Sequence, residues 1–178
     1  MRTIGFRSNL LFIIAAAAGL LAALGRPWYA KAPVQTPEEA RIGDVQGGPQ
    51  SANLGDLAAA QASYERALAI RERLARADPT NAQVQRDLAI NLEWIGDVQG
   101  APGFPNLGDL AGAQGSYERA LAIREVLART NPSNVEAQRD LAVSRERIGD
   151  ARRAGGNLVA AQASYEQALA IKERLARA

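Results

Sequence analysis

The sequence predicts an all-α fold, a solenoid of three helical hairpins that follows an apolar anchor helix at the N-terminus. The first observation is an octapeptide, SYERALAI or SYEQALAI, that occurs three times, at Ser63–Ile70, Ser116–Ile123 and Ser164–Ile171. A pentapeptide, IGDVQ or IGDAR, follows the same spacing, at Ile42–Gln46, Ile95–Gln99 and Ile148–Arg152. A third marker, RDLA, occurs at Arg86–Ala89 and Arg139–Ala142. Units of this length stack in series, because no unit buries its apolar face alone.

The composition excludes several classes of protein. The 178 residues are 47% hydrophobic but only 5% aromatic, which predicts a thin core of small side chains. The net charge is +2, and charges of both signs alternate along the helices, so no basic patch for nucleic acid is predicted. Because the chain has no cysteine and no histidine, disulfides, Ser-His-Asp triads and Cys/His zinc sites are excluded.

The segment over residues 1–35 lies before the repeats and carries the apolar run Leu10–Leu24. As a helix this run is about 22 Å long, which suits a secretory signal peptide better than a bilayer of roughly 30 Å. However, Trp28 and Tyr29 follow it where an interfacial aromatic belt lies, and Pro33 hinders cleavage after the nearest small-residue site. We therefore favour an uncleaved single-pass anchor with extracytoplasmic repeats. The alternatives are a secreted or periplasmic product after cleavage, and a buried apolar helix without a targeting role.

Thr36 begins the first unit, which we place at about residues 36–79. Thr36 has the position of a helix N-cap, Pro37 the first helical position, and Glu39 completes a capping box. These residues predict a short helix over Pro37–Gln46.

The middle unit, at about residues 80–132, shows both helices of a hairpin most clearly. A first helix is predicted over Ala82–Gly100, capped by Asn81, because apolar residues recur every three or four positions: Val84, Leu88, Leu92, Ile95 and Val98. A second helix is predicted over Asp109–Thr130, with a buried side made of Leu110, Ala113, Tyr117, Ala120, Leu121 and Leu127. A proline-containing break precedes the third unit, at about residues 133–178, because proline cannot continue the preceding helix.

The units resemble the tetratricopeptide repeat, over about Thr36–Ala178. That family places a glycine late in the first helix, then Ala, an aromatic and Ala along the second. The third unit has these residues at the family's spacing, and the other two have them after a loop insertion: Gly149, Ala161, Tyr165 and Ala168; Gly96, Ala113, Tyr117 and Ala120; Gly43, Ala60, Tyr64 and Ala67. The resemblance implies a right-handed array of helical hairpins in which tyrosine fills the gap between units.

The sequence departs from the family in three ways. The basic unit is 48 residues rather than 34, which lengthens each helix by about two turns and keeps the apolar stripe on one face. Two units carry an insertion between their helices, at Gly47–Gly55 and Gly100–Gly108. The large aromatic early in the first helix is missing, and of the residues in its place only Leu92 suits its packing role: Glu39, Leu92 and Arg145.

A row of carboxylates is the first candidate binding site. By the resemblance, Asp44, Asp97 and Asp150 face the concave groove in which such repeats hold extended peptides, with Glu93 and Glu146 one turn earlier. Such a row suits a basic peptide through charge-assisted hydrogen bonds. The alternative is a set of solvated helix charges kept by copying of the repeat.

The second insertion is the other candidate. Phe104, between Pro102 and Pro105, has the character of an exposed aromatic anchor on a binding edge. The alternative is a rigid spacer, with Phe104 folded onto its own unit.

The resemblance implies a non-enzymatic protein–protein interaction module that binds a protein or peptide. With the N-terminal apolar segment, we expect a scaffold or adaptor held at a bacterial-type membrane. No catalytic residue, metal site or cofactor is predicted. Two alternatives remain open. One is a self-associating structural protein, because no polar capping helix follows the last unit and its apolar residues suit another chain: Leu158, Tyr165, Leu169 and Leu175. The other is a fragment of a larger signalling protein, since long-helix repeats look similar to arrays attached to signalling domains.

Overall fold

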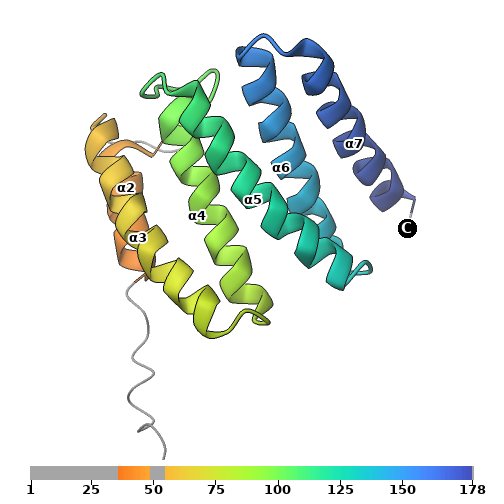
Figure 1. The fold of residues 1–178 in the computed structure, drawn as a ribbon, viewed down its shortest axis with the longest axis horizontal. Coiled ribbons are helices and arrows are strands. Elements are labelled where there is room, and N and C mark those ends of the chain that lie inside the picture. The colour runs from red at the N-terminus through yellow and green to blue at the C-terminus, as the bar shows by residue number, and fades with distance from the viewer. Residues whose placement is uncertain (1–35, 49–54, 178) are drawn as a thin grey trace, which may run out of the picture. The chain divides into compact units, whose positions relative to one another are not determined.

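The computed structural model describes residues 36–48 and 55–177. Within them the chain forms helices and no strand, in the order α2 (Thr36–Gly47), α3 (Leu57–Ala77), α4 (Ala82–Gly100), α5 (Leu110–Thr130), α6 (Val135–Ala154) and α7 (Leu158–Ala176) (Figure 1). Gln35–Ala178 form one compact unit. The predicted N-terminal anchor helix lies outside the described residues, and none of the described helices has the length and apolar character needed to cross a membrane.

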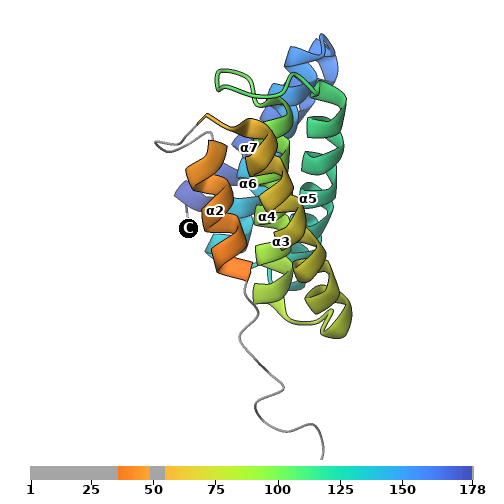
Figure 2. The same ribbon diagram turned by 90° about the vertical axis from the view of Figure 1, so that its left-hand side faces the viewer.

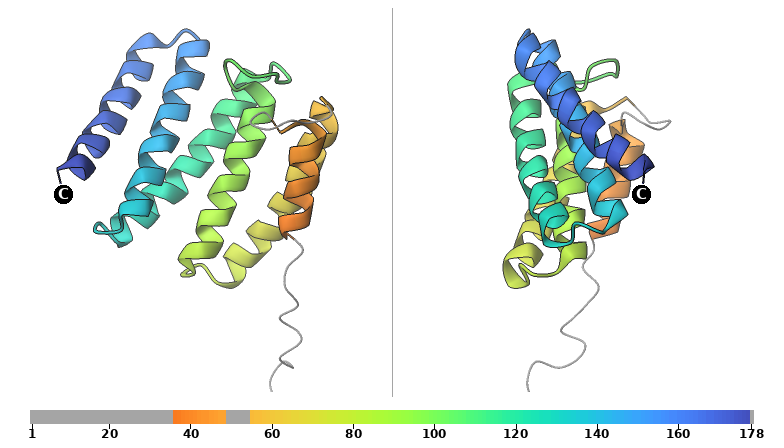
Figure 3. Two further views of the ribbon diagram at one scale, coloured as in Figure 1. Left: turned by 180° about the vertical axis from the view of Figure 1, so that it is seen from behind. Right: turned by 90° about the vertical axis from the view of Figure 1, so that its right-hand side faces the viewer.

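The helices pack as three antiparallel hairpins in series. The hairpins are α2–α3, α4–α5 and α6–α7, and they contact each other through α3 on α4 and α5 on α6. In Figure 1 α5 lies in front of α4 and α6, and in the opposite view on the left of Figure 3 it lies behind them. In the side view of Figure 2, α4 lies between α2 and α5. The predicted all-α solenoid of three units is therefore confirmed.

The helix starts follow from the capping residues. Asn81 caps α4 as predicted, because its Oδ1 accepts hydrogen bonds from the backbone N–H groups of Gln83 and Val84 at 3.1 and 3.2 Å. Asp109 caps α5 by accepting a bond from Gly112 N at 2.8 Å, so this helix begins one residue later than predicted. The predicted capping box at the start of α2 lies outside the side chains that the structure describes.

Glycine and alanine allow the two helices of each hairpin to approach closely around the tyrosine. A Cβ built on Gly96 would lie 2.6 Å from Cε1 of Tyr117, and the same contact recurs at the other two repeated glycines. Ala113 and Ala120 are buried in the same hairpin. Leu92 is buried in a core cluster with Leu88 and Ala89, so it takes over the packing of the missing aromatic. Small residues thus set the helix separation, and tyrosine fills the space that remains.

Leu110 departs from the prediction that it lies on the buried side of α5. It is exposed, whereas the corresponding Leu57 of α3 packs against the cluster that contains Val98. The residue that corresponds to Val98 in the next unit is Ala151. Because alanine is smaller than valine, Ala151 covers less of the first turn of α5, where Leu110 lies.

Candidate partner-binding surface

The repeated aspartates hold their own hairpins together. In each unit the aspartate that follows the glycine accepts a hydrogen bond from the tyrosine hydroxyl on the second helix. The three pairs are Tyr64–Asp44 at 2.5 Å, Tyr117–Asp97 at 2.7 Å and Tyr165–Asp150 at 2.8 Å. The bond fixes the end of the first helix against the second helix. From the sequence, two alternatives were open for these aspartates: they face the groove, or they are solvated. The structure shows a third arrangement, in which each aspartate bonds to the tyrosine of its own hairpin.

Asp97 lies inside the junction between the second and third hairpins. Its side chain is 2% exposed, and it also pairs with the guanidinium of Arg147 from α6. That guanidinium lies 5.9 Å from the centre of the Tyr117 ring. Burial raises the pKa of Asp97, and this outweighs the opposing effects of Arg147 and the tyrosine bond. Burial and the charge of Asp97 also raise the pKa of Tyr117.

Glu93 is buried in the same junction. Its carboxylate accepts a hydrogen bond from Ser144 Oγ at 2.5 Å and lies 3.6 Å from the guanidinium of Arg124. Ser144 belongs to α6, whose side chains therefore cover both Glu93 and Asp97. The predicted acidic row is interrupted, because two of its five carboxylates are covered by the next unit.

The other members of the row reach solvent. Glu146 is half-exposed and pairs with Lys172 of α7. Asp44 is half-buried beside its tyrosine. Asp150 is more open, with Arg153 one turn later at 3.6 Å. Glu146 and Asp150 lie one turn apart on α6, but the buried pair on α4 separates them from Asp44, so the three do not form one continuous acidic surface.

A cleft of about 690 Å³ opens between the N-terminal parts of α4 and α6. The C-terminal part of α5 completes it, with apolar side chains from Ile123, Val126 and Leu127. Amide side chains, including Gln83 and Asn131, also line the cleft. This combination of apolar side chains with a few polar groups is typical of sites for peptides and small ligands.

An ion network crosses this cleft and was not predicted. Asp140 Oδ2 accepts hydrogen bonds from Arg86 Nε at 2.8 Å and from Arg124 Nη1 at 2.5 Å, and Arg86 also pairs with Glu136 at 2.8 Å. The network joins α4, α5 and α6. Arg86 belongs to the first RDLA copy and Asp140 to the second, so complementary charges in adjacent copies were the available signal.

The second insertion forms an ordered loop with Phe104 on its outside. Asn106 holds it, because its amide donates to the carbonyl oxygens of Ala101 and Phe104, both at 2.9 Å, and its Oδ1 accepts from Gly108 N at 2.8 Å. Gly103 and Gly108 have positive φ angles of 86° and 77°, which other residues rarely adopt. Phe104 is exposed on this loop, as the binding-edge alternative requires.

Serial hairpins, each held by a glycine, a tyrosine and small residues, define the class of α-helical repeat solenoids. Comparison with known families is consistent with the resemblance, since a tetratricopeptide repeat model matches residues 51–73. The match includes most of α3 and its octapeptide, which the other two hairpins repeat. The chain is therefore similar to the tetratricopeptide-repeat family over these residues. No curated protein and no solved structure matches it.

Proposed function

We propose that the chain is a non-enzymatic scaffold or adaptor that binds an extended segment of a partner protein in the cleft between α4 and α6. Tetratricopeptide repeats generally act by binding proteins and are generally non-catalytic. Among the described residues, no cluster of acidic side chains is arranged to hold a metal ion. The cleft is the observation that carries the proposal, because it combines volume, apolar surface and hydrogen-bonding groups in one place.

The lining of the cleft favours a particular kind of segment. Val126 is half-exposed beside Ile123 and Leu127, so apolar side chains of a partner have a surface to cover. The amides of Gln83 and Asn131 can exchange hydrogen bonds with an extended backbone. Arg86 and Asp140 neutralise each other within the cleft, which favours an apolar segment of low net charge over a strongly charged one.

Two further surfaces belong to the proposal as competitors. The loop that carries Phe104 presents one exposed aromatic side chain, the kind of residue that dominates many interfaces. The accessible carboxylates, Asp44, Glu146 and Asp150, suit a basic segment. Both are weaker candidates, because Phe104 stands alone and the carboxylates do not form a continuous row.

A paired substitution distinguishes the surfaces. The full chain serves as bait for chemical cross-linking, and mass spectrometry identifies the partner and the cross-linked residues. Val126→Glu should then reduce binding of that partner, because it places a charge in the apolar part of the cleft. Val143→Glu is the matched control, since Val143 is similarly exposed but does not line the cleft.

Each other outcome has a defined meaning. Loss of binding in Phe104→Ala, with Val126→Glu unaffected, would move the site to the loop. Loss of binding at high salt and in Asp150→Asn alone would favour the carboxylates. Binding that survives all three changes would overturn the proposal for every one of these surfaces.

We also propose that the segment over residues 1–35 holds the protein in a bacterial membrane. The support is the uncharged run Leu10–Leu24 with Trp28 and Tyr29 at its end. When expressed in a bacterium, the full chain should sediment with membranes and resist carbonate extraction. A soluble product that begins near Pro33 would show a cleaved signal instead.

A further inference from the structure

The two junctions between hairpins follow one pattern. At each, an isoleucine and a small aliphatic residue of one unit's first helix pack on the tyrosine and alanine of the preceding unit. Ile95 and Val98 pack in this way on Tyr64 and Ala60. At the second junction Ile148 and Ala151 pack on Tyr117 and Ala113, and Arg147 pairs with Asp97.

The outer face of α2 carries the same residues without a preceding hairpin among the described residues. Ile42 is 45% exposed, whereas the corresponding Ile95 is 4% exposed. Val45 is 57% exposed, whereas the corresponding Val98 is fully buried. Arg41, one residue before Ile42, corresponds to Arg147 and is also exposed. We call these three residues, Arg41, Ile42 and Val45, the α2 face.

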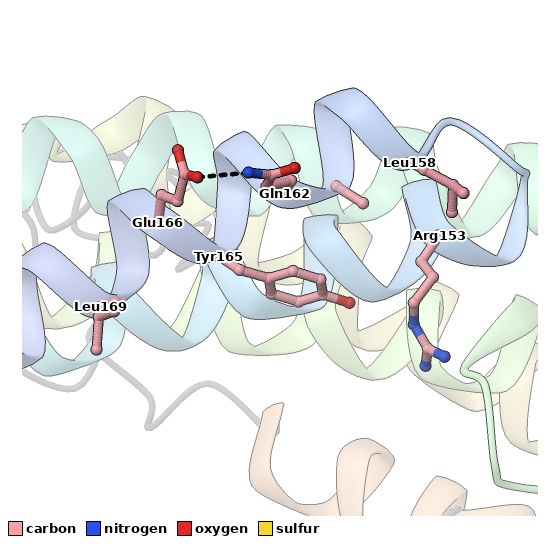
Figure 4. Close-up of a pocket in the computed structure, with 7 residues that line it drawn as sticks. Arg153, Leu158, Gln162, Tyr165, Glu166 and Leu169 are labelled. Atoms are coloured by element: carbon pink, nitrogen blue, oxygen red, sulfur yellow. Dashed lines mark hydrogen bonds between the residues drawn. The ribbon is translucent and has the colours of Figure 1, made fainter.

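The outer face of α7 carries the complementary residues. Leu158 and Leu169 are 65% and 56% exposed, and they line a shallow cavity of about 370 Å³ together with Tyr165 (Figure 4). Leu158 corresponds to Leu57 and Leu169 to Leu68, and both of those pack against the first junction. Asp150, which accepts the bond from Tyr165, corresponds to Asp97. We call Leu158, Tyr165, Leu169 and Asp150 the α7 face.

We propose that the α2 face of one copy of this chain docks on the α7 face of a second copy, so that the solenoid continues from chain to chain. Ile42 and Val45 would cover Leu158 and Tyr165 as Ile95 and Val98 cover Leu57 and Tyr64. The charges are complementary as well, because Arg41 would meet Asp150 as Arg147 meets Asp97. The two faces differ, so the contact is head-to-tail, and such contacts build rings or open chains rather than closed two-fold dimers.

Sedimentation of the full chain tests the association. In a mild detergent, which keeps the apolar N-terminal segment dispersed, the average mass should rise steadily with protein concentration. Val45→Asp and Leu169→Asp should each abolish this rise, because each places a charge in the apolar contact. Val143→Asp is the control, since Val143 is comparably exposed but belongs to neither face. A chain that stays monomeric at every concentration overturns the proposal.

Charge reversal tests the pairing of the two faces. Arg41→Asp alone and Asp150→Arg alone should each weaken association. A chain that carries both changes should recover it, because the reversed charges then meet at every junction. Weakening without recovery in this double variant would contradict the Arg41–Asp150 pair.

Cross-linking tests the direction of docking. The chain has no cysteine, so Val45→Cys and Leu158→Cys each introduce a single thiol. A short bismaleimide should join the two variants when they are mixed and should join neither to itself. Cross-links within one variant would show that like faces meet, and that result overturns head-to-tail docking.

Discussion

The two junctions between hairpins build on the same tyrosine but cover it with different chemistry. At the first junction the Trp94 ring lies 5.7 Å from the Tyr64 ring, centre to centre. At the second, Arg147 has the position of Trp94 and reaches both Tyr117 and Asp97. The repeated glycine, tyrosine and aspartate therefore fix the hairpin. The residue two before the glycine of the unit that follows the junction, Trp94 or Arg147, decides whether the junction is aromatic or ionic.

A second difference follows from the residue three before the glycine of the unit that precedes the junction, Gly96 at the second junction and Gly43 at the first. At the second junction this residue is Glu93, and it lies beside Arg124. At the first junction it is Ala40, so the corresponding Arg71 stacks over Trp94 at 5.5 Å instead. The Nε and Nη1 atoms of Arg71 are buried and make no hydrogen bond within the described part of the chain. Burial lowers the pKa of Arg71, as it does for any cation removed from water.

Tyr117→Ala is expected to have the largest effect, because it removes the ring that fills the second junction. Loss of a buried aromatic side chain costs about 3–5 kcal/mol, and this change also takes a hydrogen bond from the buried Asp97. Unfolding in urea, followed by circular dichroism, should show a lower midpoint. Tyr64→Ala is the comparison at the first junction. A midpoint unchanged in Tyr117→Ala would show that the ring does not support the junction.

The sequence predicted the fold well because the fold depends on local and repeated features. The bounds of α4, the Asn81 cap and the burial of Tyr117 follow from periodicity and capping chemistry, and the structure confirms them. The cover over Asp97 could not be predicted in this way. It depends on Arg147, which lies 50 residues further along the chain, and on how closely α6 approaches α4. Spacing places a residue on a helix face, but the neighbouring helix decides whether that face is open.

Gly96→Ala tests the part that the two junctions share. The added Cβ would lie 2.6 Å from Tyr117, and overpacking of this kind costs about 1–3 kcal/mol. Gly43→Ala should cost a similar amount, because its Cβ would lie 2.6 Å from Tyr64. Gly115→Ala is the control, since its Cβ meets nothing within 4 Å and a helical glycine replaced by alanine gains about 0.5–1 kcal/mol. Thermal melting should show a lower melting temperature for Gly96→Ala and Gly43→Ala and a higher one for Gly115→Ala. A higher melting temperature for Gly96→Ala would contradict the close packing of Gly96 on Tyr117.

Ala40→Glu tests the difference between the junctions by making the first resemble the second. The new carboxylate should pair with Arg71 as Glu93 pairs with Arg124. Because hydrogen bonds to charged groups contribute about 1.5–3 kcal/mol and the buried site must admit a larger side chain, we expect a net gain of about 1 kcal/mol. Ala40→Gln, of nearly the same size but uncharged, is the control. A loss of stability in both variants would mean that the first junction has no room.

Asp97→Asn is expected to have the smallest effect, and its pH dependence decides whether burial or Arg147 dominates the second junction. Burial raises the pKa of Asp97, so the folded protein holds this proton more tightly than the unfolded chain does. Asp97 therefore contributes stability below the unfolded pKa of about 3.9, and that contribution is lost as the pH rises through the raised pKa. Asparagine stays neutral and keeps the oxygen that accepts from Tyr117, while Arg147 can turn toward water.

The stability of Asp97→Asn relative to the parent chain should therefore increase as the pH rises above about 4, and then level off. Urea unfolding of both chains across this range measures the difference. Asp44→Asn is the matched control, because its half-buried carboxylate keeps contact with water and the first junction offers Trp94 in place of the arginine. A difference that instead grows in favour of the parent as the pH rises would show that Arg147 outweighs burial. In that case the second junction gains stability from its ion pair, whereas the first has Trp94 packed on Tyr64 in the place of that pair.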